Sequence, residues 1–277
     1  GVTRYGVHCF LAAGLVVVSY GQIMTENFVF NALLVAVFAS ALITVLLLLF
    51  VNAPYGRHQS SGWGPTIPVR LGWVLMESPA SLVFFYFYFS GAQAWQPVPL
   101  LLMLMWQLHY VHRSFIYPFQ IRVKPGSRTT ALVIALGSLY CGINGYLNGA
   151  YISHYADHLT QDWLTDPRFI GGVVLFAFGY FLNKQSDRIL RALRQNNPGE
   201  YQIPYGLGFR WVSMPNYLGE IITWSGFALA SWSLAGLSFV VFTMANLVPR
   251  ALANHRWYQE TFSDYPKDRR AVIPYIL

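Results

Sequence analysis

One uncharged run constrains this chain more than any other feature. Residues 28–51 contain no Lys, Arg, Asp or Glu. As a helix with ~1.5 Å rise per residue this run would be about 36 Å long, enough to cross the ~30 Å hydrocarbon core of a bilayer. The composition agrees, since 55% of the residues are hydrophobic and 10% are charged, against about 25% charged in soluble domains. The sequence therefore predicts an all-α integral membrane protein.

Further apolar runs predict a seven-helix transmembrane bundle. Four of them are long enough for one crossing each, and residues 217–249 are long enough for two crossings with a turn near Ser233. The four single runs are residues 69–90, 98–119, 129–153 and 168–184. No G-x-G-x-x-G follows a predicted strand, so no Rossmann domain is expected.

The basic residues alternate between the predicted loops. Residues 52–70, 120–128, 185–216 and 250–277 hold 14 of the 18 Lys and Arg, whereas the segments between them, 91–97 and 154–167, hold none. Such an alternation is the positive-inside pattern, and it predicts that the C-terminus faces the cytoplasm. It also explains the net charge of +7 without a nucleic-acid partner.

The N-terminal segment is compatible with three arrangements. Residues 5–24 are apolar enough to form an extra spanning helix, to lie at the interface, or to act as a signal-like segment. We therefore divide the chain into an N-terminal hydrophobic extension (1–27) and a single seven-helix membrane domain with a cytoplasmic tail (28–277). Two cysteines, Cys9 and Cys141, exclude a disulfide framework and a four-thiolate zinc site.

Two polar residues lie unusually deep in the predicted helices. Glu77 is eight residues from the cytoplasmic end of its run and Tyr110 is nine from the end of the next. They are thus about 12 and 13 Å deep and can share a level. Trp73 lies one turn from Glu77 on the same face, and Tyr110, Arg113 and Tyr117 form a second stripe. A carboxylate in a membrane helix usually marks a functional site, although a structural polar network between helices explains the same pattern.

Polar residues also recur at the cytoplasmic ends of later helices. Asn183, Asp187, Arg191 and Arg194 would share one helix face, and further groups follow at Asn216 with Glu220 and at Arg250 with Tyr258. Basic residues that converge in this way can hold a phosphorylated ligand. A solvated helix face is the alternative interpretation. His109 and His112 resemble metal ligands only weakly, because no carboxylate or Cys partner has a suitable spacing, so no metal site is predicted.

With these motifs in hand, the sequence resembles the steroid 5α-reductase (3-oxo-5α-steroid 4-dehydrogenase) family. The matching stretches occur in order from residue 54 to residue 277. They are YGRH (55–58), ESP (77–79), HYVHRSFIY (109–117), NG (144–145), DWLTDPRF (162–169), SDRILRALR (186–194), NYLGE (216–220), ALASWS (228–233), HRWY (255–258), YPK (265–267) and IP (273–274). Four features depart from the family pattern: Met76, Thr223, Asn254 and the sequence GLGF at 206–209.

The resemblance implies an enzyme that uses NADPH to reduce the 4,5 double bond of a 3-oxo-Δ4 steroid such as progesterone or testosterone. It implies that Glu77 and Tyr110 bind the C3 ketone, with Trp73 beside them. The residues expected around NADPH are Arg113, Tyr117, Lys124, Asn183, Asp187, Arg194, Asn216, Glu220, Arg250 and Tyr258. The expected setting is a monomer surrounded by membrane lipid, in the endoplasmic reticulum of a eukaryote or the inner membrane of a bacterium.

The chemistry fits these residue types. Hydride attack at C5 of an enone moves electrons onto the C3 oxygen, and a Tyr hydroxyl and a protonated carboxyl can both donate hydrogen bonds to that oxygen. Burial favours the protonated form of Glu77. Two rival functions stay open: a membrane reductase for another lipid, such as a polyprenol or an enoyl thioester, and a non-enzymatic lipid-binding or transport protein. A membrane methyltransferase is a more distant alternative.

Overall fold

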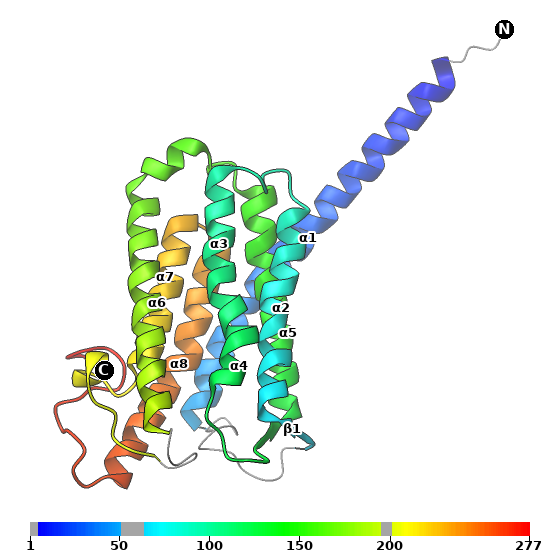
Figure 1. The fold of residues 1–277 in the computed structure, drawn as a ribbon. Helices are drawn as coiled ribbons and strands as arrows, with labels where there is room; N and C mark the ends of the chain where they lie inside the picture. Colours follow the sequence, from blue (N-terminus) through cyan, green and yellow to red (C-terminus); the bar gives the residue numbers. More distant parts are fainter. Residues whose placement is uncertain (1–4, 51–63, 195–200) are drawn as a thin grey trace.

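The chain forms a bundle of long helices (Figure 1). The computed structural model describes residues 5–50, 64–194 and 201–277, with side chains described from residue 27 onward except at residue 49. Within these ranges seven α-helices have 15 residues or more. They are α1 (Tyr5–Phe50), α2 (Val69–Phe89), α3 (Pro97–Val111), α5 (Ala131–Ala150), α6 (Pro167–Leu193), α7 (Pro215–Ser231) and α8 (Leu234–Thr261).

The helical prediction is confirmed, and the predicted turn at Ser233 divides α7 from α8. Trp232 adopts a left-handed conformation there (φ 45°), and the Ser233 hydroxyl accepts a hydrogen bond from the Gly236 amide at the start of α8. Among the described residues, three spans are long and apolar enough to cross a membrane: Asn27–Leu48, Ala131–Tyr155 and Leu234–Thr261. Because α3 and α7 have 15 and 17 residues, and α2 and α6 carry charges, the count of seven crossings stays a prediction.

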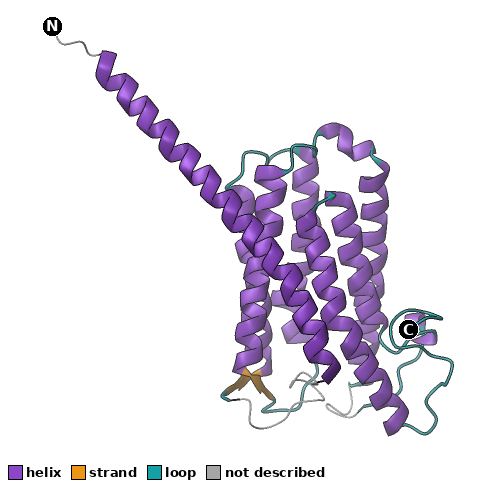
Figure 2. Cartoon of the chain, turned by 180° about the vertical axis from the view of Figure 1, so that it is seen from behind, coloured by secondary structure: helices purple, strands orange, loops and turns teal. Residues whose placement is uncertain are grey.

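The N-terminal segment, for which the sequence left three arrangements open, is part of a longer helix. Residues 5–27 continue directly into the run 28–50 as one helix of 46 residues. The segment contains no proline, and nothing else in it stops the hydrogen-bond ladder. At ~1.5 Å per residue α1 is roughly 70 Å long, and its N-terminal half projects away from the other helices (Figure 2).

Close packing of α6 against α7 sets the geometry of the polar residues described below. A Cβ on Gly179 would lie 2.4 Å from the Thr223 amide nitrogen, and one on Gly219 would lie 2.5 Å from the Asn183 amide nitrogen. Only glycine lets the two backbones approach so closely, as in other membrane helix pairs. The contact brings Asn183 of α6 level with the first turns of α7.

Aromatic side chains fill the centre of the bundle. Trp106 of α3 is fully buried and stacks on Phe84 of α2 with ring centroids 4.7 Å apart. It also packs against Trp224 and Phe227 of α7 and Phe239 of α8, at 5.3, 5.3 and 5.6 Å. Four helices therefore meet at Trp106, which holds the adjoining part of α3 rigidly in place.

Several short elements complete the fold. In the described chain the strands β1 (Thr66–Pro68) and β2 (Arg128–Thr130) form one two-stranded antiparallel sheet with Thr66 opposite Thr130. This sheet was not predicted, and it joins the beginnings of α2 and α5. The other elements are the π-helices η2 (His112–Ile116) and η3 (Tyr151–Tyr155), the α-helix α4 (Tyr117–Gln120), and the 3₁₀ helices η4 (Gln161–Thr165) and η5 (Leu207–Arg210).

Candidate active site

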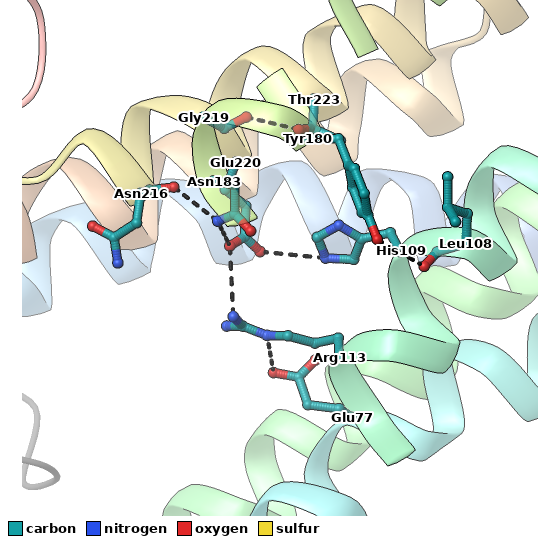
Figure 3. A network of polar contacts seen from close by, with 10 residues as sticks. All are labelled: Glu77, Leu108, His109, Arg113, Tyr180, Asn183, Asn216, Gly219, Glu220 and Thr223. Carbon is teal, nitrogen blue, oxygen red and sulfur yellow. Dashed lines mark hydrogen bonds and ion pairs between the residues drawn. The ribbon is translucent and has the colours of Figure 1, made fainter. Parts of the chain in front are cut away.

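A chain of charged and polar side chains crosses the inside of the bundle (Figure 3). Arg113 lies between two carboxylates, with its Nε 3.3 Å from Glu77 Oε1 and its Nη1 3.8 Å from Glu220 Oε2. His109 Nε2 lies 3.9 Å from the other oxygen of Glu220. All four side chains are at least four-fifths buried. The sequence placed Arg113 with the cofactor, but the structure also joins it directly to Glu77.

A π-helix positions Arg113. Helix α3 passes into η2 (His112–Ile116) just before Pro118. Proline has no N–H, and its ring collides with the carbonyl four residues earlier, so the regular α-helical ladder cannot continue through this point. The wider π-helical turn accommodates the missing hydrogen bond and the bulk of the proline ring. Such turns often occur at functional sites. Arg113 therefore does not follow Tyr110 with regular α-helical geometry.

The contact between α6 and α7 produces a second polar group beside the first. Asn183 Nδ2 donates to the Asn216 carbonyl at 2.9 Å and lies 3.4 Å from Glu220 Oε2. Asn216 Nδ2 in turn donates to Asp187 Oδ1 at 3.2 Å. Asn183 and Asp187 are buried. The structure thus gathers four of the predicted cofactor residues into one network that Glu220 connects to Arg113 and Glu77.

Aromatic side chains extend from this network toward the end of the bundle where α4 lies. The Arg113 guanidinium lies over the rings of Trp73 and Tyr117, 4.8 and 5.4 Å from their centroids. Trp73 meets Tyr117 edge to face at 5.4 Å, and Arg191 lies on Tyr117 at 5.9 Å. The predicted substrate residue Trp73 and the predicted cofactor residues Arg113 and Tyr117 are therefore neighbours.

Tyr110 lies in the aromatic core. It is 4% exposed, stacks on Trp224 at 5.4 Å and packs on Trp106 at 4.9 Å. His109, the next residue, contacts both the Tyr110 ring and the Trp224 ring, at 5.2 and 4.6 Å. The hydroxyl-bearing ring is thus held between the apolar centre of the bundle and the His109–Glu220 contact.

Four predicted cofactor residues lie in other surroundings. The Arg194 guanidinium packs on the Tyr201 ring at 5.0 Å. Tyr258 stacks on Tyr265 of the C-terminal segment at 5.3 Å. Lys124 is exposed in the loop between α4 and β2, and Arg250 is half-buried on α8. Arg194 and Tyr258 thus pack on tyrosine rings outside the group formed by Glu77, Arg113 and Glu220.

His109 is the site residue that sequence reasoning undervalued. It was weighed only as a weak metal ligand, yet it is 1% exposed and contacts Glu220. Its spacing of four residues from Arg113 would place both on one helix face, and that was the available signal. Within the described residues, no group of three or more His, Cys, Asp or Glu is placed to hold a metal ion.

Several buried polar atoms around the network have no hydrogen-bond partner among the described residues. These atoms are Asn183 Oδ1, Asn216 Oδ1, Lys184 Nζ and Arg191 Nη1. Buried polar atoms in proteins are nearly always paired, so this group has the capacity to bind a polar ligand. Both acceptors and cationic donors are present, which fits a ligand with amide, hydroxyl and phosphate groups.

Two of the departures from the family pattern have structural explanations. Thr223 lies where α6 and α7 touch, and its hydroxyl donates to the Gly219 carbonyl at 2.7 Å. A longer acidic side chain would meet the backbone of α6 at Gly179. Met76 packs over Gly137 of α5, where a Cβ would lie 2.7 Å from Met76 Cγ.

The helical bundle and its three apolar spans fit a membrane protein, and a network of buried charged and polar side chains lies inside the bundle. A family model described as 3-oxo-5-alpha-steroid 4-dehydrogenase matches residues 127–277. The chain belongs to this family, which confirms the resemblance, and the family's name describes oxidoreductases.

Curated relatives match over most of both chains. Steroid 5-alpha-reductase DET2 of Gossypium hirsutum is 39% identical over 256 residues, covering 91% of this chain and 99% of the relative. The 3-oxo-5-alpha-steroid 4-dehydrogenase 1 of Bos taurus is 40% identical over 261 residues, covering 92% and 99%. The human protein of the same name is 40% identical over 227 residues, covering 81% and 86%.

Proposed function

We propose that this protein reduces the 4,5 double bond of a 3-oxo-Δ4 steroid, such as progesterone or testosterone, with NADPH. The observation that carries the proposal is the 40% identity with a 3-oxo-5-alpha-steroid 4-dehydrogenase over 92% of the chain. The buried network of Glu77, Arg113 and Glu220 supports it, because it provides a charged site next to the aromatic centre of the bundle.

NADPH would be held by the polar network and by the basic residues near it. Asn183, Asp187, Asn216 and Glu220 offer amide and carboxylate groups, and the unpaired atoms at Asn183, Lys184 and Asn216 fit its polar groups. Arg113, Tyr117, Lys124, Arg194, Arg250 and Tyr258 complete the proposed set. When bound, NADPH supplies the hydride for C5 of the steroid.

Tyr110 and Glu77 are the proposed donors to the C3 oxygen of the steroid. As negative charge grows on that oxygen, hydrogen bonds from a fixed hydroxyl and a fixed carboxyl lower the energy of the transition state. The packing of Tyr110 against Trp106 and Trp224 holds the hydroxyl in place and keeps water away. The aromatic core also suits the flat apolar steroid, which reaches the site from the bilayer, with Trp73 beside it.

Arg113 bears on the protonation state of Glu77. Its positive charge at 3.3 Å favours the carboxylate, whereas burial favours the neutral acid. For Glu77 to be protonated and donate a hydrogen bond, the Arg113 guanidinium must turn toward another negative group. Arg113 is one of the residues that would hold NADPH, whose phosphates would supply negative charge, and Glu77 would then be free to act as a neutral donor.

The orientation and assembly belong to the same proposal. The loops rich in Lys and Arg, including the segment between α6 and α7 and the C-terminal tail, face the cytoplasm. All seven long helices cross the membrane. The protein is a monomer surrounded by lipid. The membrane is the endoplasmic reticulum in a eukaryote or the inner membrane in a bacterium. NADPH then enters from the cytoplasm and the steroid from the bilayer.

Product analysis tests this function. The purified protein is incubated with NADPH and progesterone, and the steroids are identified by mass spectrometry against 5α- and 5β-reduced standards. The 5α product with matching NADPH oxidation supports the proposal. NADPH oxidation with a polyprenol or an enoyl thioester, but not with steroid, would show a reductase for another lipid. Absence of NADPH oxidation with every substrate would favour a lipid-binding or transport protein.

A further inference from the structure

A groove at the cytoplasmic end of the bundle is lined by four arginines. It lies between the beginning of α2, the end of α4 and the last turns of α6, which meet at the lower side of Figure 1. Its volume is about 440 Å³, and its lining residues are Arg70, Phe119, Gln120, Ile121, Arg122, Arg188, Arg191 and Ala192. None of these residues carries a negative charge.

The four positive charges are only partly balanced by the described part of the chain, in which the charge of Asp187 interacts with that of Arg191. None of the arginines forms an ion pair with a carboxylate among the described residues. Asp187, one helical turn before Arg191, accepts instead from Asn216 at 3.2 Å. Arg191 Nη1 is buried without a hydrogen-bond partner in the same part of the structure. Four like charges around one groove repel each other, so an anion that bound there would relieve the repulsion.

Apolar surface adjoins the basic groove. Phe119, which lines it, is 66% exposed, and Phe115 and Ile116 are exposed one turn earlier. On α6 the exposed Phe181 lies ten residues before Arg191, which is about 15 Å deeper in the bundle. A soluble anion would not bind to this apolar surface, whereas the hydrocarbon chains of a lipid would pack against it. Basic pockets between helices on the cytoplasmic side of membrane proteins bind lipid phosphates in this way.

We propose that this groove binds the phosphate of an anionic phospholipid of the cytoplasmic leaflet. The phosphate accepts hydrogen bonds from the arginines, with Arg191 at the inner end, and the acyl chains lie along Phe119 and the lipid-facing side of the bundle. Because Arg191 also packs on Tyr117 at 5.9 Å, the lipid headgroup lies one side chain away from the aromatic side chains that lead to Arg113 and Glu77. The proposed reductase activity is not needed for this site.

The test uses the purified full chain in detergent and fluorescently labelled phosphatidylglycerol or phosphatidylcholine with identical acyl chains. The test variant is Arg122→Gln/Arg188→Gln, since both residues line the groove outside the proposed catalytic and cofactor residues. The matched control is Arg210→Gln/Arg256→Gln, which removes two exposed arginines elsewhere in the basic loops. NADPH affinity is measured on the same samples.

The wild type should prefer phosphatidylglycerol to phosphatidylcholine. The groove variant should bind phosphatidylglycerol about 30-fold more weakly, since each arginine near an anionic headgroup contributes roughly a factor of five. The control variant and the NADPH affinity should remain unchanged, and Arg122→Lys/Arg188→Lys should keep most of the binding.

Three results would overturn the assignment. Equal weakening by the control variant would show that the attraction comes from general surface charge. No preference for the anionic lipid would show that the groove does not select a negatively charged headgroup, because phosphatidylcholine also carries a phosphate. Loss of NADPH binding with unchanged lipid binding would show that the arginines serve the cofactor's phosphate. If the Gln variant does not fold, the Lys variant and the lipid comparison on the wild type still decide the question.

Discussion

Arg113 Nε lies 3.3 Å from Glu77 Oε1, and this contact joins the residue expected to bind the steroid ketone to a residue expected to bind the cofactor. The side chains are 18% and 12% exposed, so the pair is largely shielded from water. A second carboxylate, Glu220, lies 3.8 Å from the same guanidinium. Arg113 is therefore the physical link between the two halves of the proposed site.

Removing that link should destabilise the bundle. Arg113→Gln leaves two buried carboxylates without their cation, which typically costs about 3–5 kcal/mol and should lower the Tm in detergent by roughly 10 °C. Arg210→Gln, at an exposed position, should change the Tm little. The double variant Glu77→Gln/Arg113→Gln should lose less stability than the sum of its single variants, because the two residues interact. Strict additivity would show that the contact is energetically unimportant.

Two adjacent glycines test the packing of α6 on α7. A Cβ on Gly172 would lie 2.4 Å from the Ala230 amide nitrogen, whereas the nearest atom to a Cβ on Gly171 is 3.8 Å away. Gly172→Ala should therefore cost about 1–3 kcal/mol through overpacking. Gly171→Ala should be neutral, or stabilising by up to about 1 kcal/mol, because alanine is the better helix former. Thermal unfolding of the two variants side by side measures the difference, and equal melting temperatures would contradict the close approach of the helices.

The loop before α6 has a pH-dependent cap. Asp166 accepts hydrogen bonds from the Arg168 backbone N–H and from its guanidinium, at 2.8 and 2.9 Å. The guanidinium hydrogen bonds, assisted by the backbone N–H, lower the pKa of Asp166 from 3.8 to about 2. The contribution of the Asp166 charge is thus complete above pH ~3.8 and is lost as the pH falls through about 2.

Comparison with Asp166→Asn isolates this effect. Asparagine can still cap the helix but does not titrate. The Tm of the wild type should therefore exceed that of the variant above pH 4, and the difference should shrink toward pH 2. A difference that is independent of pH would contradict the assigned role of the charge.

The polar network should govern cofactor affinity. Asn216→Ala removes the hydrogen bond to Asp187 and an amide oxygen next to the proposed NADPH site, and we expect the Kd for NADPH to rise about tenfold. Asp187→Ala and Arg194→Ala should act in the same direction, with little effect on the steroid KM. Arg210→Ala is the control. Unchanged NADPH affinity in Arg194→Ala would show that the end of α6 is only a solvated face, as its packing on Tyr201 also allows.

Much of this architecture could be predicted from the sequence, because apolar runs and basic loops report directly on a membrane environment. The turn between α7 and α8 and the polar positions Glu77 and Asn183 followed from their contrast with apolar surroundings. The sheet of β1 and β2 could not be foreseen, since three-residue strands have no measurable periodicity. Nor could the continuity of α1, because its composition was compatible with several different arrangements.

The arrangement within the site was harder to predict. The Arg113–Glu77 contact depends on the π-helical turn before Pro118, which regular helix spacing does not describe. The Asn183–Glu220 contact depends on glycine-to-backbone packing between α6 and α7. Helix spacing shows which residues share a face but not how deeply two helices interpenetrate, so the residue types were predictable and their pairing was not.

The central claim is that Tyr110 and Glu77 donate hydrogen bonds to the C3 oxygen of the steroid. Tyr110→Phe removes one donor and keeps the ring that packs on Trp106 and Trp224. Glu77→Gln keeps a neutral donor, and Glu77→Ala removes it. If the Tm and the NADPH affinity both decreased in these variants, Tyr110 and Glu77 would belong to a structural network and would not be a catalytic pair.

The most direct measurement is the turnover of progesterone by Tyr110→Phe, with the Tm and the NADPH affinity recorded on the same samples. We expect turnover to fall by roughly 100-fold or more while the fold and NADPH binding persist. Glu77→Gln should retain partial activity, whereas Glu77→Ala should be inactive. Full steroid reduction by Tyr110→Phe and by Glu77→Ala would contradict the account.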